Sequence, residues 1–290
     1  MRITNAQLQD QIISFLAGNQ ERLASVQRQI STSKEVATSS DDPVKFNRAG
    51  RFKSLLKRTE QHLDNIDSGL AWIRVGAESL NIVYDALQQI RQLGMQSRSD
   101  ADPGARATTA IYVEAAIKEM VQMGNTRFAG RFLFGGTITK GADPFTFDGI
   151  SVTYAGNDGE ISRKVGEGTY LRINIVGSEF DNIFDAGIAM RDAMVANDGL
   201  AMDAALAAID TVSEELLTTI TGSGSIQRRL ELTRDNLEIS RINLQATISQ
   251  SEDVDLTEAI MRFNARELGF RAALESSTRI MNISILNHLR

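Results

Sequence analysis

Apolar residues recur along the first half of the chain with the spacing of a helix seam. Counting alternately three and four residues from Ala49 meets an apolar side chain at every step as far as Leu87, except at Thr59. A stripe with this heptad spacing is typical of a long helix that packs on other helices. It predicts one helix from about Pro43 to Ser97. The seam residues expected in the core of the resulting rod are Leu56, Leu63, Leu70, Ile73, Leu80 and Leu87.

A second stripe lies towards the end of the chain. Leu230, Leu237 and Leu244 recur every seven residues, and we expect them to complete the rod core from a helix antiparallel to the first. The glycines of Gly222-Ser223-Gly224 predict a pause in the helix just before this stripe.

The three prolines, each preceded by aspartate, divide the chain. Asp is a favoured N-cap and Pro suits the first helical position, so Asp42-Pro43 and Asp102-Pro103 predict helix starts, the second helix ending near Arg127. Asp143-Pro144 instead precedes alternating residues and the turn Asp148-Gly149, which predicts a strand and a hairpin. Further turn signals and alternating runs up to about residue 176 predict a small antiparallel β insert with its own small core.

Amphipathic stripes also occupy both ends of the chain. Asp255 opens a capping-box sequence that ends in Glu258 and starts the last helix. Lone helices of this length are marginal in water, so we expect the two ends to pair with each other only on assembly with other copies. The residues predicted for this assembly interface are Leu8, Ile12, Phe15, Leu23, Val26, Ile260, Phe263, Phe270, Leu274, Ile283 and Leu286.

The predicted fold class is therefore mainly α with a β insert: an elongated antiparallel helical bundle or coiled-coil rod, formed by the N- and C-terminal segments, with a small antiparallel β domain in the middle. The expected division is into terminal helices at 1–42 and 255–290, rod segments at 43–132 and 181–254, and the β insert at 133–180.

Composition narrows the function classes. The 290 residues include no cysteine, and 31 Lys and Arg against 37 Asp and Glu give a net charge of −6. This charge argues against a nucleic-acid binder. Apolar runs are too short for a membrane helix, and residues 1–20 lack a signal-peptide core. Without cysteine there are no disulfides and no thiol chemistry.

The search for reactive groups finds no catalytic, cofactor or metal site. His62 and His288 stand far apart in the sequence and are expected to be solvated or partly packed. Asp253 and Asp255 could bind a metal as a pair of carboxylates, but capping of the last helix explains them more simply. We therefore predict that the protein is not an enzyme and needs no cofactor.

Short motifs along the chain resemble the flagellin superfamily. The start Met1-Arg2-Ile3, the loop at residues 40–43 and the segment Asn125–Thr137 are similar to the hook–filament junction members of this family. Residues 87–93, the stretch around Gly224 to Glu231 and the last helix match flagellin helices more generally. Pro43 and the sequence Leu133-Phe134-Gly135-Gly136 favour the junction members over flagellin itself. One departure is Thr32-Ser33-Lys34, where the family commonly has a Ser-Gly-Lys or Ser-Gly-Arg turn.

The resemblance implies a structural subunit of the bacterial flagellum that joins hook to filament. Such a protein is exported unfolded through the flagellar type III channel without a cleaved signal peptide, and it acts outside the cell. Its implied partners are other copies of itself, the adjacent hook-associated protein, flagellin and an export chaperone, with no nucleic acid and no membrane. Two alternatives stay open: a flagellin filament subunit and an intracellular coiled-coil adaptor.

Overall fold

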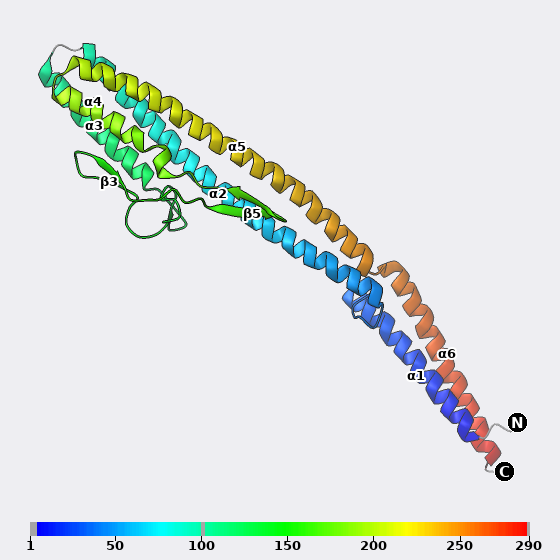
Figure 1. Cartoon of the computed structure of the whole chain (residues 1–290). Helices are drawn as coiled ribbons and strands as arrows, with labels where there is room; N and C mark the ends of the chain where they lie inside the picture. The colour runs from blue at the N-terminus through cyan, green and yellow to red at the C-terminus, as the bar shows by residue number, and fades with distance from the viewer. Residues whose placement is uncertain (1–4, 100–101, 289–290) are drawn as a thin grey trace. The chain divides into compact units, whose positions relative to one another are not determined.

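The chain is built mainly from long helices, with short strands in the middle of the sequence (Figure 1). The computed structural model describes residues 5–99 and 102–288. It divides into two compact units. Unit 1 combines Met1–Arg58 with Ser240–Arg290, and unit 2 is the continuous segment Thr59–Ile239. The predicted class, mainly α with an antiparallel β region between N- and C-terminal helices, is confirmed.

Six α-helices account for most of the described residues. They are α1 (Asn5–Thr32), α2 (Pro43–Ser99), α3 (Pro103–Gly124), α4 (Asp181–Val195), α5 (Gly199–Glu252) and α6 (Leu256–His288), and a short 3-10 helix, η1 (Gly177–Glu179), precedes α4. The predicted starts at Pro43 and Pro103 are confirmed. The Asp42 carboxylate accepts hydrogen bonds from the N–H groups of Val44 and Lys45, and Asp102 accepts one from Gly104.

The predicted pause at Gly222-Ser223-Gly224 is wrong, because α5 runs through it without a break. Each glycine costs a helix about 1 kcal/mol relative to alanine, which is small beside the packing of a helix of this length. The hydroxyls of Ser223 and Ser225 donate to the carbonyl oxygens of Ile220 and Gly222, so both serines satisfy their side chains within the helix.

In unit 2, α2 and α5 run antiparallel, as predicted. Arg98 pairs with Asp203, Arg91 with Asp210, and Asp67 with Arg234, so residue numbers fall along α5 as they rise along α2. Between the first and last of these pairs, the Gln88 amide donates to the Ser213 hydroxyl. Leu70 and Leu87 of the α2 seam belong to the same hydrophobic cluster as Leu230 of α5.

The β region consists of three antiparallel hairpins (Figure 1). They pair β1 (Arg127–Phe128) with β2 (Arg131–Phe132), β3 (Phe145–Phe147) with β4 (Val152–Tyr154), and β5 (Ser162–Gly166) with β6 (Thr169–Arg172). The turn at Asp148-Gly149 joins β3 to β4 as predicted, with Asp148 accepting from the N–H groups of Ile150 and Ser151.

The expectation that the insert has its own core is wrong. Phe145 on β3 belongs to the same hydrophobic cluster as Ile117 on α3 and Phe184 on α4. The ring centroids of Phe145 and Phe184 lie 5.1 Å apart. Strands this short bury too little apolar surface to be stable alone, so the hairpins complete their core with the helices.

Unit 1 joins segments from the two ends of the sequence. Helix α1 lies beside α6 in this unit (Figure 1), whereas the sequence predicted that these helices pair only on assembly. Asp255 caps α6 as predicted, since its carboxylate accepts hydrogen bonds from the N–H groups of Thr257 and Glu258. Among the residues that the structure describes, none of the helices has the length and apolar character needed to cross a membrane.

Candidate functional site

A buried carboxylate lies at the end of α5 in unit 1. The side chain of Glu252 is 3% exposed and pairs with two lysines. Its Oε2 lies 2.9 Å from Nζ of Lys34, in the loop after α1, and its Oε1 accepts from Nζ of Lys53 on α2. One carboxylate therefore ties together three segments that are far apart in the sequence.

The backbone reinforces this contact. The N–H groups of Glu35 and Val36 donate to the carbonyl oxygen of Glu252, and the N–H of Val254 donates to the carbonyl oxygen of Ser33. Lys34 and Asp253 form an antiparallel bridge. The carbonyl at the end of α5 thus finds donors outside its own helix, as a helix terminus requires. We call these residues the joint: Ser33, Lys34, Glu35, Val36, Lys53, Glu252, Asp253 and Val254.

Charge pairing at the joint shifts two pKa values. Burial alone would raise the pKa of Glu252, but hydrogen bonds from Lys53 and Lys34 outweigh it and hold the pKa below its ordinary value. The hydrogen bond to Glu252 raises the pKa of Lys34, against a smaller opposing effect of burial. Both groups are therefore charged at neutral pH.

Helices α1 and α6 carry the residues that the sequence assigned to an assembly interface. Val26 is buried between elements of unit 1, and Ile12, Leu23, Phe263 and Phe270 are half-buried. Three others face solvent: Phe15, Ile260 and Leu274. The side chains of Leu8, Ile283 and Leu286 lie outside the described residues. The pair thus buries one stripe and leaves large apolar side chains exposed.

The residues assigned to the rod core fall into two groups. Leu70, Ile73, Leu80, Leu87 and Leu230 are buried in the hydrophobic cluster of unit 2. The others are half-buried, namely Leu56, Leu63, Leu237 and Leu244.

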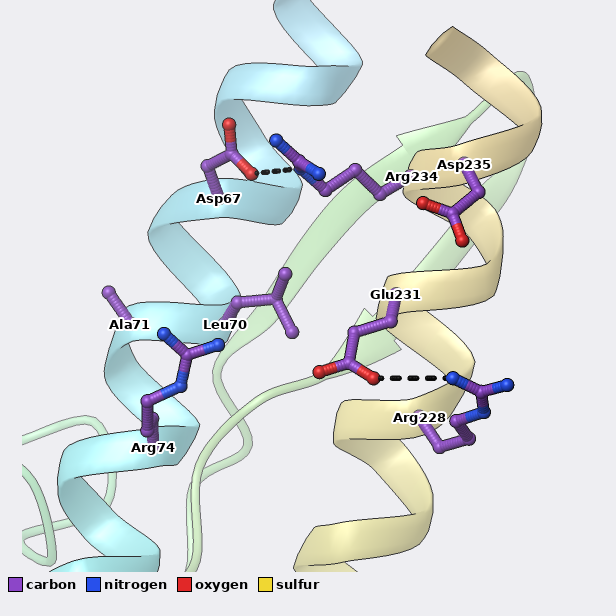
Figure 2. Close-up of a pocket in the computed structure, with 8 residues that line it drawn as sticks. All are labelled: Asp67, Leu70, Ala71, Arg74, Arg228, Glu231, Arg234 and Asp235. Carbon is purple, nitrogen blue, oxygen red and sulfur yellow. Dashed lines mark hydrogen bonds and ion pairs between the residues drawn. The ribbon is translucent and has the colours of Figure 1, made fainter. Parts of the chain in front are cut away.

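A charged hollow of about 450 Å³ lies between α2 and α5 in unit 2 (Figure 2). Both helices contribute side chains to it, and Asp67 pairs with Arg234 while Glu231 pairs with Arg228. Arg74 and Asp235 complete the charged lining. Three acids face three arginines, so the hollow favours neither an anion nor a cation.

The structure shows the surroundings of the histidines and aspartates that were considered as reactive or metal-binding groups. Asp255 caps α6, Asp253 lies in the joint, and His62 is partly packed on α2. The side chain of His288 lies outside the described residues. Within residues 5–99 and 102–288, no group of three or more His, Asp or Glu side chains is placed to hold a metal ion.

The joint is the feature that sequence reasoning missed. Glu252 was part of the segment before the last helix, and Lys34 and Lys53 carried no motif. A signal was nevertheless present, because Glu252 lies next to the predicted end of a long helix and Thr32-Ser33-Lys34 follows the end of another. Helix ends leave backbone groups that need partners, so two such ends in one unit favour a mutual contact.

Comparison with known proteins matches both ends of the chain to one family. Residues 3–139 match the bacterial flagellin N-terminal helical region, and residues 206–289 match the bacterial flagellin C-terminal helical region. The flagellar hook-associated protein 3 of Salmonella typhimurium is 22% identical over 98% of this chain and 98% of its own length. The flagellin of Halalkalibacterium halodurans is 23% identical over 81% of this chain and 79% of its own.

Solved structures share the fold. A putative flagellar hook-associated protein from Vibrio parahaemolyticus superposes with a TM-score of 0.67 at 17% identity, over 73% of this chain and 100% of that chain. FlgL from Bacillus cereus gives a TM-score of 0.61 at 21% identity, over 68% of this chain and 98% of that chain.

Proposed function

Because the chain belongs to the bacterial flagellin family, we propose that it is a structural subunit of the bacterial flagellum that joins the hook to the filament, as a hook-associated protein 3. The observation that carries this proposal is the end-to-end match to the hook-associated protein 3 of Salmonella typhimurium, which leaves almost no part of either chain unmatched. The flagellin match leaves about a fifth of each chain uncovered.

The surfaces of the molecule support a role in assembly without catalysis. Many of the described acids and bases are engaged in caps, ion pairs and the joint, and the hollow in unit 2 is balanced in charge. Large apolar side chains instead face solvent on α1 and α6. Exposed apolar groups of this kind mark protein contacts more often than reaction sites.

We place the contacts with neighbouring copies on the outward side of α1 and α6. Phe15, Ile260 and Leu274 are exposed there although α1 and α6 already pair within one chain. Their burial in a neighbour would be worth about 1.5–3 kcal/mol for each fully covered side chain. In this proposal residues 1–42 and 255–290 form the assembly region, 43–132 and 181–254 the rod, and 133–180 the β region.

The remaining proposals concern the binding partners of the chain and its export from the cell. The partners are other copies, the adjacent hook-associated protein, flagellin and an export chaperone. The chain leaves the cell unfolded without a cleaved signal peptide and acts in the extracellular flagellum. Its lack of cysteine suits this route, because no disulfide can form before export.

Gene deletion tests the proposal. Cells without the chain should keep hooks, lack filaments and release flagellin into the medium, and the wild-type gene should restore motility. If the deletion removes filaments without releasing any flagellin, the chain is the filament subunit itself. Detection in cytosol but not in sheared flagella or medium would indicate the coiled-coil adaptor instead.

A matched pair of variants tests the assembly region. Phe15→Ser and Tyr170→Ser remove aromatic side chains of nearly equal exposure, 59% and 60%. Phe15→Ser should reduce the amount of the chain in isolated flagella, whereas Tyr170→Ser on β6 should leave it unchanged. Equal incorporation of both variants would refute the placement of this contact.

A further inference from the structure

Charge is segregated along α2. Pro43–Arg58 contains six basic residues and no acidic one, whereas residues 60–85 contain five acidic residues and one basic residue. The chain as a whole has a net charge of −6, so the basic segment stands out against its surroundings. The basic segment of α2 in one copy is therefore complementary in charge to the acidic segment of α2 in a second copy.

The basic segment has a face that the other described residues of unit 1 leave partly open to solvent. A shallow hollow of about 690 Å³ lies over it, and eight residues of this one helix line it. Phe46 and Leu55 at its sides are 37% and 41% exposed. We call the lining residues the basic face: Phe46, Asn47, Gly50, Arg51, Phe52, Ser54, Leu55 and Arg58.

Gly50 is one of the residues that line this face. A Cβ at this position would meet nothing within 4 Å, so packing inside the chain does not require a glycine. A glycine inside a helix costs about 1 kcal/mol relative to alanine. The missing side chain leaves room for an apolar side chain of another molecule to approach the helix backbone between Phe46 and Leu55.

One of the two arginines on this face is available for a partner. Lys45 and Lys53 are used inside unit 1, where they pair with Glu35 and Glu252. Arg51, which lies on this face, is exposed and forms no ion pair within the described part of the chain. A partner that suits this face carries carboxylates on either side of an apolar side chain.

Another part of α2 has this chemistry. Glu78, Ile82 and Asp85 follow each other at four and three residues, so they share one side of the helix, and all three are exposed. Neither carboxylate forms an ion pair within residues 5–99 and 102–288. We call Glu78, Ile82 and Asp85 the acidic face.

We infer that the basic face of one copy binds the acidic face of a second copy, with Ile82 seated over Gly50 and Arg51 near the carboxylates of Glu78 and Asp85. The two surfaces differ, so a bound pair leaves one basic face free on one copy and one acidic face free on the other. A contact of this kind is heterologous and adds copies in one direction, which closes into a ring or extends as a helix. The inference rests on the proposed function in one respect, because it assumes that many copies of the chain assemble in the flagellum.

Cysteine cross-linking tests the contact, because the chain has no cysteine of its own. Gly50→Cys and Ile82→Cys are introduced into two differently tagged copies, co-expressed, and oxidised mildly in isolated flagella. Gly50→Cys keeps the helix because its Cβ has open space. The pair should give a disulfide-linked dimer carrying both tags, at least ten-fold above that of either variant expressed alone.

The matched control pairs Gly50→Cys with Val195→Cys, which is also exposed but lies outside both faces. This pair should give no more dimer than the single variants. Equal yield from the control, or no dimer although both variants are present in flagella, would overturn the inference. A disulfide between the Gly50→Cys variant and a different protein would assign the basic face to another partner and overturn it as well.

Charge reversal gives a second readout. Arg51→Glu and the double change Glu78→Lys with Asp85→Lys should each lower the yield of dimer at least ten-fold when placed in both cysteine-bearing copies. Combining all three changes in each copy should restore it. No recovery would mean that opposite charge does not hold the two faces together.

The experiments distinguish a failure of the proposed contact from a failure of the proposed function. A chain that is absent from flagella refutes the proposed function. The same disulfide is then sought in concentrated purified protein, where its formation supports the contact and its absence refutes it.

Discussion

Nζ of Lys34 lies 2.9 Å from Oε2 of Glu252, although 218 residues separate the two in the chain. The carboxylate is buried while both of its lysine partners, Lys34 and Lys53, reach solvent. The joint thus holds the loop after α1, the start of α2 and the end of α5 in one place within unit 1.

Removing the carboxylate should loosen the joint. Glu252→Ala loses two charge-assisted hydrogen bonds, and because both lysines are partly solvated we expect a cost of about 1–2 kcal/mol in the free energy of unfolding unit 1. Hydrogen exchange of the Glu35 and Val36 amides measures it. The control is Glu275→Ala, which removes an exposed pair with Arg279 on α6. A larger effect of the control than of Glu252→Ala would contradict the assignment.

The joint should also weaken at both extremes of pH. The pKa of Glu252 is lowered in the folded chain, so its contribution is complete above the ordinary glutamate value of about 4.3 and is lost as pH falls through the lowered pKa. The pKa of Lys34 is raised, so its contribution is complete below about 10.4 and is lost as pH rises through the raised pKa.

Unfolding of Glu252→Gln followed against pH measures the acid part of this effect. The wild type should lose stability relative to this variant below about pH 4.3, where an ordinary glutamate binds its proton. A constant difference between the two proteins from pH 7 to pH 3 would show that Glu252 does not titrate as described.

Two leucines of the α2 seam should differ in their contribution to stability. Leu87 is fully buried in unit 2, whereas Leu63 is half-buried. Leu87→Ala should lower the free energy of unfolding by about 2–5 kcal/mol, because it leaves a cavity in the core. Leu63→Ala should cost clearly less, because solvent already reaches the site. Chemical denaturation of the two variants compares them, and similar losses would show that both positions of the seam are equally covered.

Phe145 should matter to the whole of unit 2. Phe145→Ala removes a ring that contacts Phe180 and Phe184, and we expect a loss of about 3–5 kcal/mol. Tyr170→Ala, on the exposed side of β6, should stay within about 0.5 kcal/mol of the wild type. Thermal unfolding followed by helical circular dichroism makes the comparison. If Phe145→Ala melts only the hairpins and leaves the helices unchanged, the hairpins fold separately.

Ser33 should gain from replacement by glycine. Its φ is 55°, which places it in the left-handed region directly after α1, where glycine is favoured. Ser33→Gly should therefore stabilise unit 1 by about 1 kcal/mol. Ser31→Gly, within α1, should instead destabilise by several tenths of a kcal/mol. Melting temperatures of the two variants would move in opposite directions; a decrease for Ser33→Gly would contradict the strain described at this turn.

The helices of this fold could be predicted from sequence because their signals are local. The seam from Ala49 to Leu87 and the aspartates before Pro43 and Pro103 act through neighbouring residues, and the structure places the helices where these signals indicate. The hairpin turn at Asp148-Gly149 is local in the same sense. The prediction of a pause at Gly222 was wrong, because the low helix propensity of glycine is a small local cost. The packing of the long helix α5 outweighs this cost.

The joint and the shared core of the hairpins could not be predicted in this way. Lys34 and Glu252 carry no motif and meet only when the ends of two helices come together. Phe145 alternates with polar residues as in any strand, and nothing in that alternation says that its ring packs on Phe184. Both features depend on tertiary packing between segments remote in sequence.

The bridge between Lys34 and Asp253 also sets the order in which the chain can fold. Unit 2 is one continuous segment, whereas unit 1 needs residues from both ends of the sequence. Closing a loop of this length costs chain entropy before any contact repays it, and such non-local contacts form slowly. A chain that emerges from its N-terminus can therefore complete unit 2 first. Unit 1 stays open until the residues after Ser240 have emerged.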